Sequence, residues 1–353
     1  MDSADDHLAP HGGWPGILGR LVERRDLSPE AARAAVEVML AGDASPTVIA
    51  AFLVGLRVKG EQPQEVAAML DAVDANAVRV DLPESLADTA IDVVGTGGDG
   101  SNSVNVSTMA ALVAAGAGAV VCKHGNRSAS SQCGTADVLE ELGVTVTLGP
   151  AQVAACVEHT GFGFCLAPAF HPAFRHVGPT RRELGVRTVF NMLGPMANPA
   201  RVTRHVIGVA DPLVADTMVD TLTTRGSHHA WVVHGQGMDE LTTTGPSTVT
   251  ELHDGDRRTF DVDPQALGLD PATPDDLRGG DAQHNAAVVH AVLGGHVGPH
   301  RDVVVLNAAA ALVVAGVTST IADGLDAARA AIDDGRAARV LEAVVAFTGP
   351  MSQ

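Results

Sequence analysis

The feature that most constrains the fold is a strand–loop–helix–strand pattern in the first third of the chain. The short apolar run Ile91–Val94 predicts a buried strand, and Gly95–Asp99 contains too many glycines for a regular element. The alanine-rich run Met109–Ala115 predicts a helix, and Ala119–Cys122 predicts the next strand. Together these segments form a βαβ unit, which places two loops at the carboxyl edge of a sheet, where open α/β proteins bind ligands.

Both of these loops carry groups that suit an anion. Glycines let backbone N–H groups turn toward a ligand, and Ser107 is expected to cap the helix, whose N-terminus favours negative charge. Directly after the second strand, residues 123–128 place five polar side chains around one glycine, with Lys123 expected just beyond the strand end. The pattern therefore predicts a site for a phosphorylated ligand.

Composition limits the class of protein. The net charge of −19 argues against nucleic-acid binding, and we interpret most of the surplus Asp and Glu as solvated surface. No apolar run approaches the roughly 18 residues of a membrane helix. Residues 1–14 are polar and acidic, do not resemble a secretory signal, and predict a disordered tail. The four cysteines show no paired spacing, which favours the reducing cytoplasm.

The chain is expected to have an α/β fold, with a small helical N-terminal domain and a larger α/β domain built on a mainly parallel central sheet. Residues 15–86 are predicted to be helical, with Pro29, Pro46 and Pro63 each in the first turn of a helix. Residues 87–353 alternate strand and helix, and Asp254-Gly255 predicts a hairpin turn. Further expected elements are a strand at Val144–Thr147, helix over residues 171–193, and a helix over Ala322–Phe347.

Two sets of residues are candidates for metal binding. An acidic pair by itself is more typical of a solvated loop, but Asp239 and Glu240 follow the predicted strand Ala230–Val233, and this position favours a function. Their hard oxygen atoms suit Mg²⁺. The histidine pairs at positions 7 and 11 and at positions 296 and 300 each have a proline before the second histidine, so no helical zinc site is supported. His228 and His229 are interpreted as loop residues.

The loops resemble the signature segments of a known family. Gly95-Thr-Gly-Gly-Asp99, Asn105-Val-Ser-Thr108 and Lys123-His-Gly-Asn-Arg-Ser128 are similar to those of anthranilate phosphoribosyltransferase, which catalyses the second step of tryptophan biosynthesis from chorismate. The resemblance spans roughly residues 15–350. It continues through His171–His176, Arg181–Gly185, Thr188–Pro195, Asn198–Ala200, Gly237–Glu240 and Gly279–Ala286.

This resemblance implies transfer of the 5-phosphoribosyl group from phosphoribosyl pyrophosphate to the amine of anthranilate. Anthranilate would contact Gly95, Asn126 and Arg181. The metal ligands would be Ser107, Asp239 and Glu240, with two Mg²⁺ ions per active site. The donor would contact Gly95, Gly98, Asp99, Ser103, Asn105, Val106, Ser107, Thr108, Lys123, His124, Gly125, Asn126, Arg127, Ser128, Ala129, Ser130, Ser131 and Thr135. Thr135 stands where the family has a serine, and His124 is a secondary candidate for donating a hydrogen bond to the acceptor.

Spacing alone does not choose among Arg175, Arg181, Arg182 and Arg187 as the partner of the anthranilate carboxylate; the resemblance selects Arg181. The resemblance also implies that residues 171–193 return to the helical domain, which leaves residues 87–170 and 194–353 as the α/β domain. It further implies a homodimer formed through the helical region.

Two alternative functions compete with this one. A pyrimidine nucleoside phosphorylase has a related glycine-rich loop, but the Lys123–Asn126 segment and the Asp239-Glu240 pair disfavour it. A non-catalytic relative that binds nucleic acid or a protein would have a basic face and would lack the metal carboxylates, in contrast to this acidic chain.

Overall fold

The computed structural model describes residues 7–128 and 132–349. Its N-terminal part is helical, as predicted. The three prolines predicted to lie in the first turn of a helix do so. Ser28 Oγ accepts from the Ala31 N–H at 3.2 Å, and Ser45 Oγ accepts from the Val48 N–H at 3.4 Å. These helices are α2 (Gly13–Val22), α3 (Pro29–Ala41), α4 (Pro46–Lys59), α5 (Pro63–Ala75) and the short α6 (Glu84–Ala87).

The prediction of a disordered tail over residues 1–14 is wrong for residues 7–14, and residues 1–6 lie outside the described part. A 3-10 turn, η1 (Ala9–His11), leads directly into α2, which begins at Gly13. Leu8 is only 1% exposed and belongs to the core of the helical part. Burial of this one apolar side chain holds the segment on the surface of the bundle.

The α/β part is built on one sheet of seven strands in the order β3-β2-β1-β4-β5-β6-β7. The first five are parallel, and β6 and β7 continue the sheet antiparallel to β5, so the mainly parallel sheet is confirmed. The predicted hairpin is also confirmed, because Asp254 and Gly255 adopt the positive φ angles of 51° and 88° that its turn requires. The strands are β1 (Ile91–Gly95), β2 (Val121–Gly125), β3 (Phe162–Leu166), β4 (Arg204–Gly208), β5 (His229–Gly235), β6 (Ser247–His253) and β7 (Asp256–Val262).

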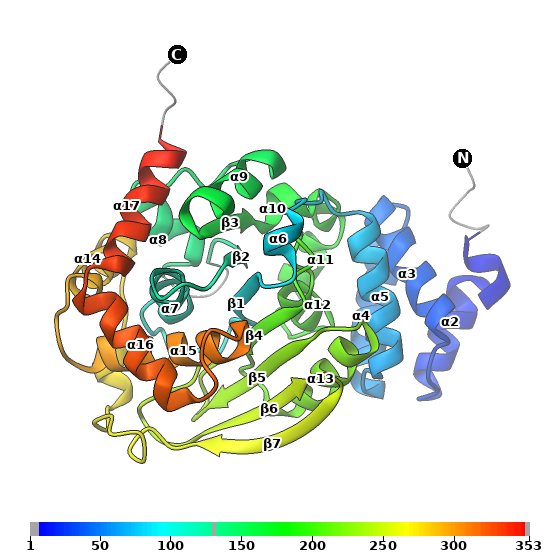
Figure 1. Cartoon of the computed structure of the whole chain (residues 1–353). Coiled ribbons are helices and arrows are strands. Elements are labelled where there is room, and N and C mark those ends of the chain that lie inside the picture. The colour runs from blue at the N-terminus through cyan, green and yellow to red at the C-terminus, as the bar shows by residue number, and fades with distance from the viewer. Residues whose placement is uncertain (1–6, 129–131, 350–353) are drawn as a thin grey trace.

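Helices cover both faces of this sheet (Figure 1). Side chains such as Val93 and Val206 face a core shared with α7 and α15, whereas Ile207 and Val232 face the core of the N-terminal helices. The remaining helices are α7 (Val106–Gly116), α8 (Thr135–Glu141), α9 (Pro150–Thr160), α10 (Ala167–Phe170), η2 (Pro172–His176), α11 (Gly178–Leu184), α12 (Phe190–Met196), η3 (Pro212–Val214), α13 (Ala215–Thr224), η4 (Pro274–Leu277), α14 (Ala282–Leu293), α15 (Pro299–Ala315), α16 (Ile321–Asp333) and α17 (Arg336–Thr348).

The segment between β3 and β4 packs against the N-terminal helices. Val177, Phe190 and Leu193 are buried in the same core as α3, α4 and α5. We therefore propose that residues 15–86 and 171–193 form one structural domain. The chain boundaries of the two domains otherwise stay predictions.

Three predicted elements need correction. The alternating run Val144–Thr147 is not a strand; Val144 and Val146 are buried, and the Thr145 N–H donates to Thr348 Oγ1 at the end of α17, so packing on a helix satisfies the pattern. The expected long helix over 322–347 is divided into α16 and α17, because Gly335 adopts a positive φ of 69° between them. The segment 171–193 is also broken into short helices.

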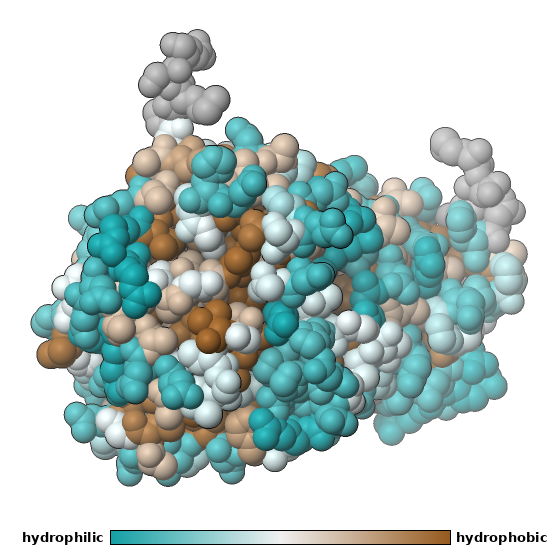
Figure 2. Space-filling view, in the orientation of Figure 1, coloured by the Kyte–Doolittle hydropathy of each residue, from teal (hydrophilic) through white to brown (hydrophobic). Residues whose placement is uncertain are grey.

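Figure 2 shows hydrophilic residues over most of the visible face, with hydrophobic residues gathered near its centre, over α7 and β1. No helix among the described residues is both long enough and apolar enough to cross a membrane.

Candidate active site

The glycine-rich loop after β1 lies at the carboxyl edge of the sheet, as predicted. Gly97 and Gly98 adopt φ angles of 69° and 71°, a conformation that L-residues rarely take. This conformation turns the Gly97 N–H toward Asp239, whose Oδ2 accepts it at 2.6 Å. The Arg187 guanidinium donates to the Gly98 carbonyl and so ties the loop to the segment before α12.

Asp239 and Glu240 follow β5 and fold back over the ends of the neighbouring strands. Gly95 and Gly208, which pair in register at the ends of β1 and β4, leave the space for this. A Cβ on Gly95 would lie 2.4 Å from Asp239 Oδ2, and one on Gly208 would lie 1.6 Å from the Asp239 carbonyl oxygen. Asn307 of α15 then holds the next residue, because it accepts the Leu241 N–H at 3.0 Å and donates to the Leu241 carbonyl at 2.8 Å.

The two carboxyl groups are short of positive charge. Burial and the nearby Asp99 raise the pKa of Asp239 to about 7, and burial together with Asp239 raises the pKa of Glu240 to about 8. Closely spaced carboxyl groups that lack adequate counter-charge suit a divalent cation with a preference for oxygen ligands. The residues present therefore fit Mg²⁺.

Lys123 lies inside β2 rather than beyond its end, which corrects the sequence prediction. Its side chain is buried (1% exposed), and its ammonium donates to the Val93 carbonyl and to Ser107 Oγ, the latter at 3.2 Å. Burial lowers the pKa of Lys123, while attraction to Asp92 and Glu240 opposes that shift. Lys123 is thus a fixed cation between the sheet and the acidic pair.

Ser107 is not the N-cap of the helix. The helix α7 begins at Val106 with Asn105 at the cap position, so Ser107 lies in the first turn, and its N–H donates to Glu240 Oε1 at 3.1 Å. A carboxylate at the N-terminus of a helix is favoured by the helix dipole. This contact brings the predicted metal ligands Ser107 and Glu240 together.

The loop after β2 is only partly directed at the site. The Asn126 side chain is exposed, and its Oδ1 accepts the Arg127 N–H at 2.7 Å. The Arg127 guanidinium pairs instead with Asp137 and Glu140 on α8. The predicted donor contacts Ala129, Ser130 and Ser131 lie outside the described residues.

The other predicted donor residues line the same edge. Thr108 Oγ1 donates to Thr135 Oγ1 at 3.4 Å, which joins the first turns of α7 and α8. Asn105 Oδ1 accepts from Asn285 Nδ2 at 2.8 Å. Ser103 Oγ accepts from Ser101 Oγ at 3.3 Å, beside the main-chain bridge to residue 278.

Aromatic rings connect β2 to Arg181. The rings of His124 and His171 have centroids 5.1 Å apart, and His171 stacks on Phe174 at 5.0 Å. Phe174 contacts Phe190 edge to face at 5.5 Å, and the Arg181 guanidinium lies over Phe190 at 5.2 Å. This row of five side chains, the aromatic row, ends in a positive charge and suits a planar aromatic acid.

Burial keeps the two histidines of the aromatic row neutral near pH 7. It lowers the pKa of His124 to about 3 and that of His171 to about 4, and for His124 the neighbouring His171 adds to the effect. His124 Nε2 is buried without a partner among the described residues. His124 therefore offers a hydrogen-bonding atom but no positive charge.

Sequence analysis missed the roles of Asp92 and Asn198. Asp92 is fully buried in β1, where its carboxylate accepts from the His124 N–H at 3.0 Å and from Asn198 Nδ2 at 2.8 Å. Burial raises its pKa to about 6, although Lys123 attracts the ionised form. The signal was present, because an aspartate inside an apolar strand needs buried partners.

The fold and the site define a glycosyl transferase. Residues 15–77 match the family model described as the helical bundle domain of the glycosyl transferase family, and residues 87–338 match its a/b domain. The solved anthranilate phosphoribosyltransferase of Thermus thermophilus is 41% identical, with a TM-score of 0.88, and the match covers 94% of this chain and 99% of that one.

Curated relatives show which family of glycosyl transferases the chain belongs to. The anthranilate phosphoribosyltransferase of Parvibaculum lavamentivorans is 49% identical over 94% of this chain and 96% of its own length, and that of an Arthrobacter species is 49% identical over 99% of both. The chain therefore belongs to the anthranilate phosphoribosyltransferase family. The Saccharomyces cerevisiae enzyme, solved in complex with PRPP and Mg, is 29% identical with a TM-score of 0.86 over 97% of this chain and 99% of that one.

Proposed function

We propose that this protein transfers the 5-phosphoribosyl group of phosphoribosyl pyrophosphate to the amine of anthranilate, giving N-(5-phosphoribosyl)anthranilate and pyrophosphate. The observation that carries the proposal is the aromatic row ending at Arg181, which begins at the strand that holds Lys123 beside the acidic pair. An aromatic acid and a polyanionic donor would thus meet at one sheet edge. The yeast relative, solved with PRPP and Mg and also with 4-fluoroanthranilate, supports this assignment.

For the donor, we propose the predicted residues of the β1 loop, the start of α7 and the β2 loop. Lys123 supplies a fixed charge and Gly98 leaves room for a pyrophosphate oxygen to approach the backbone. Arg127 contributes to this loop through its pairing with α8 rather than through a free guanidinium. The donor would replace solvent around the exposed part of the loop.

Two Mg²⁺ ions are proposed, held by Asp239 and Glu240 and by Ser107 with Glu240. Bound Mg²⁺ would neutralise the charge on the departing pyrophosphate. Asp99, which accepts the Asp239 N–H at 3.4 Å, holds the acidic pair in place. The Gly97 N–H and the Ser107 N–H fix one oxygen of each carboxylate.

For the acceptor, Arg181 would pair with the anthranilate carboxylate, and Asn126 and the Gly95 backbone would border the amine. The aromatic amine is neutral near pH 7, so its lone pair is available without a strong base. The residues of the site would then orient the amine toward the ribose C1 and exclude water. Neither alternative function is favoured, because the relatives named above are transferases and the acidic pair is retained.

The two substrates should be separable by kinetics. Loss of a charge-assisted contact typically costs about 1.5–3 kcal/mol, so Arg181→Ala should raise the KM for anthranilate roughly 10- to 150-fold and leave that for the donor nearly unchanged. Arg181→Lys should recover only part, because an ammonium lacks the planar fork. Gly98→Ala should mainly weaken donor binding, because a Cβ at φ 71° strains the loop. Equal losses for both substrates in Arg181→Ala would contradict this division.

Mg²⁺ affinity should depend on pH. The pKa values of Asp239 and Glu240, about 7 and about 8, lie above their unperturbed values, so both carboxyl groups hold protons at pH 6 that Mg²⁺ must displace. Affinity should therefore rise roughly 50-fold between pH 6 and 7 and about tenfold between pH 7 and 8, and level off above pH 8. Calorimetry with Mg²⁺ alone in buffers of different ionisation enthalpy would measure the released protons. A pH-independent affinity would refute this linkage.

We also propose a homodimer formed through the N-terminal helices. Val54 and Val58 are exposed one turn apart on α4, and Val22 is exposed at the end of α2, which packs against α4 where Gly55 approaches Leu21. Light scattering at micromolar concentration should give a dimeric mass, and Val54→Glu with Val58→Glu should give a monomeric one. Val297→Glu, at an exposed valine elsewhere, is the matched control. A monomeric wild-type chain would overturn the proposal.

A further inference from the structure

A second group of chelating side chains lies at the opposite end of strand β5 from the acidic pair. His229 is the first residue of β5 and pairs in register with His253, the last residue of β6. His228 directly precedes His229, and Asp254 directly follows His253. Asp239 and Glu240 lie beyond the far end of β5, and seven residues at about 3.3 Å each separate the two edges by roughly 20 Å.

The backbone that carries these residues is held by hydrogen bonds. The Asp254 N–H donates to the His228 carbonyl at 2.9 Å, and the His228 N–H donates to the Thr203 carbonyl at 2.8 Å. Asp254 and Gly255 form the tight turn between β6 and β7, with positive φ at both residues. The Cα positions of His228, His253 and Asp254 are therefore set before any ligand binds, which lowers the ordering cost of a chelate.

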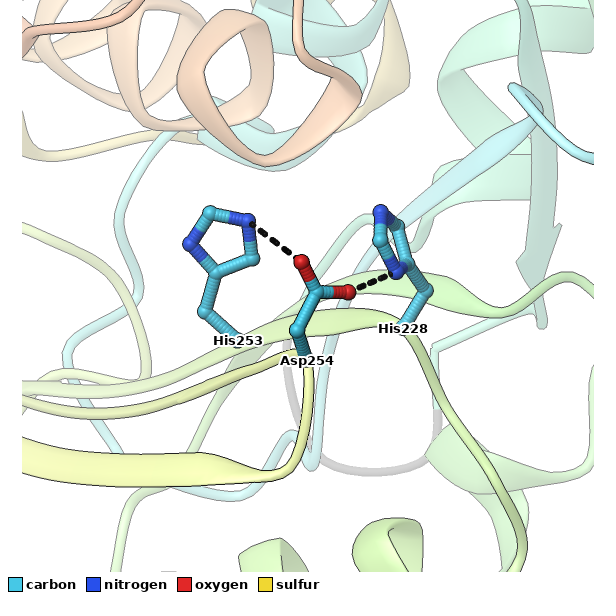
Figure 3. A group of neighbouring side chains, drawn as sticks. All are labelled: His228, His253 and Asp254. Carbon is cyan, nitrogen blue, oxygen red and sulfur yellow. Dashed lines mark ion pairs between the residues drawn. The ribbon is translucent and has the colours of Figure 1, made fainter.

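The side chains converge on one point. Figure 3 shows the Asp254 carboxylate between the two imidazole rings: its Oδ1 lies 2.5 Å from His228 Nδ1 and its Oδ2 lies 3.8 Å from His253 Nε2. One ligand atom from each residue lies within 4.8 Å of the others. The side chains are 40%, 52% and 64% exposed for His228, His253 and Asp254, so an ion and a water molecule have direct access.

We propose that His228, His253 and Asp254 bind a borderline divalent transition metal ion, with Zn²⁺ as the representative, and that water completes a tetrahedral site. Two imidazoles and one carboxylate are a ligand set that Zn²⁺ favours, whereas Mg²⁺ prefers oxygen alone. Ligand atoms about 2.0 Å from zinc are about 3.3 Å from one another. Closing the widest separation by roughly 1–1.5 Å needs only rotation of exposed side chains.

Neighbouring residues support this ligand set over the alternative of His229, Glu251 and His253. The Glu251 carboxylate already accepts from His229 at 3.0 Å, from the Trp231 indole at 2.7 Å and from Arg258. His229 stacks on His253 with centroids 4.1 Å apart and an interplanar angle of 6°, which orients the ligating ring.

One positive charge that acts on the cluster belongs to Arg204, which attracts Asp254 electrostatically. Its guanidinium donates to the Asp88 carbonyl at 3.1 Å and to the Val314 carbonyl at 2.8 Å, so it is held by backbone rather than by the cluster. The ion pairs of Asp254 among the described residues are with the two histidines. A bound ion would cross-link the start of β5 to the β6–β7 turn, which is a structural role separate from the transfer reaction.

The test is metal titration of the untagged full-length protein with saturating Mg²⁺ present, so that the acidic pair is occupied. Zn²⁺ should bind with one-to-one stoichiometry in calorimetry, and Co²⁺ in its place should give visible absorption typical of a four-coordinate site. Loss of an outer-shell partner alone weakens metal binding roughly 10- to 100-fold, so His228→Asn with His253→Gln should weaken Zn²⁺ by at least about 100-fold. The double variant should keep wild-type transfer activity, which also verifies its folding.

The matched control is His290→Gln with His296→Gln, which removes two exposed histidines outside the cluster and should leave Zn²⁺ affinity unchanged. Zn²⁺ should also raise the thermal unfolding midpoint of the wild type and of this control, but not that of the His228 and His253 variant. Equal Zn²⁺ affinity and equal thermal shifts in all three proteins would overturn the proposal.

Discussion

Replacing Asp239 by Asn together with Glu240 by Gln should lower kcat/KM for phosphoribosyl pyrophosphate by about 10³-fold or more. A metal ion typically contributes several kcal/mol to stabilising a charged transition state, and about 4 kcal/mol corresponds to that factor. The amides keep the size of the side chains but lose the charge that binds a dication. Steady-state kinetics with phosphoribosyl pyrophosphate varied at several fixed Mg²⁺ concentrations would measure the loss.

Stability provides the control for this variant. Burial and mutual repulsion raise the pKa values of both carboxyl groups, so their ionised forms destabilise the metal-free fold. At pH 8 without Mg²⁺ the double variant should be at least as stable as the wild type, and only the wild type should gain stability from Mg²⁺. Full activity of the variant with an ordinary Mg²⁺ optimum would refute the proposed metal ligands.

Lys123→Met should cost about 3–5 kcal/mol of unfolding free energy, the usual range when one partner of a buried charge pair is removed. The buried Lys123 ammonium attracts the Asp92 carboxylate electrostatically, and it also attracts Glu240 and Asp239. The raised pKa of Asp92 means that the folded protein binds a proton near pH 6 that the unfolded chain does not, so stability falls as pH rises. Removing Lys123 takes away the attraction that favours the ionised Asp92 carboxylate. The loss of stability should therefore be larger at pH 8, where Asp92 is ionised, than at pH 6.

A double-mutant cycle tests the assignment. Asp92→Asn in the Lys123→Met background should restore part of the lost stability, because the Asp92 carboxylate is then no longer buried without its cation. Lys59→Met is the matched control, since its buried ammonium pairs with Glu65 at 2.8 Å in the helical part. It should lower stability but leave the KM for the donor unchanged, whereas Lys123→Met should raise it. Chemical denaturation and kinetics on the folded fraction would separate the two effects, and equal kinetic constants would contradict the role of Lys123.

The parts of the fold that follow from local chemistry could be predicted from the sequence. Proline openings, the hairpin at Asp254-Gly255 and the glycine-rich loop after β1 each depend on residues a few positions apart. Sequence reasoning places Lys123 at the end of its strand because a lysine usually avoids a buried strand. Only the tertiary arrangement supplies the partners, Val93 and Ser107, that make its burial possible.

The arrangement of the candidate site depends on contacts between distant segments, which periodicity does not reveal. The space for Asp239 comes from Gly95 and Gly208, which meet only because β1 and β4 are paired in register. The aromatic row joins side chains from β2, the segment after β3, α12 and α11. The resemblance to a family selects Arg181, which stays a prediction, and does not indicate the rings beside it. Dimerisation, the number of Mg²⁺ ions and a cytoplasmic location stay predictions.

The most direct test of the central claim is the fluorescence of anthranilate during incubation with the purified protein, phosphoribosyl pyrophosphate and Mg²⁺. We predict that the fluorescence falls with time, that one pyrophosphate forms for each anthranilate consumed, and that omission of the donor or chelation of Mg²⁺ prevents the change. Unchanged fluorescence with all components present, in protein whose folding has been verified, would contradict the account.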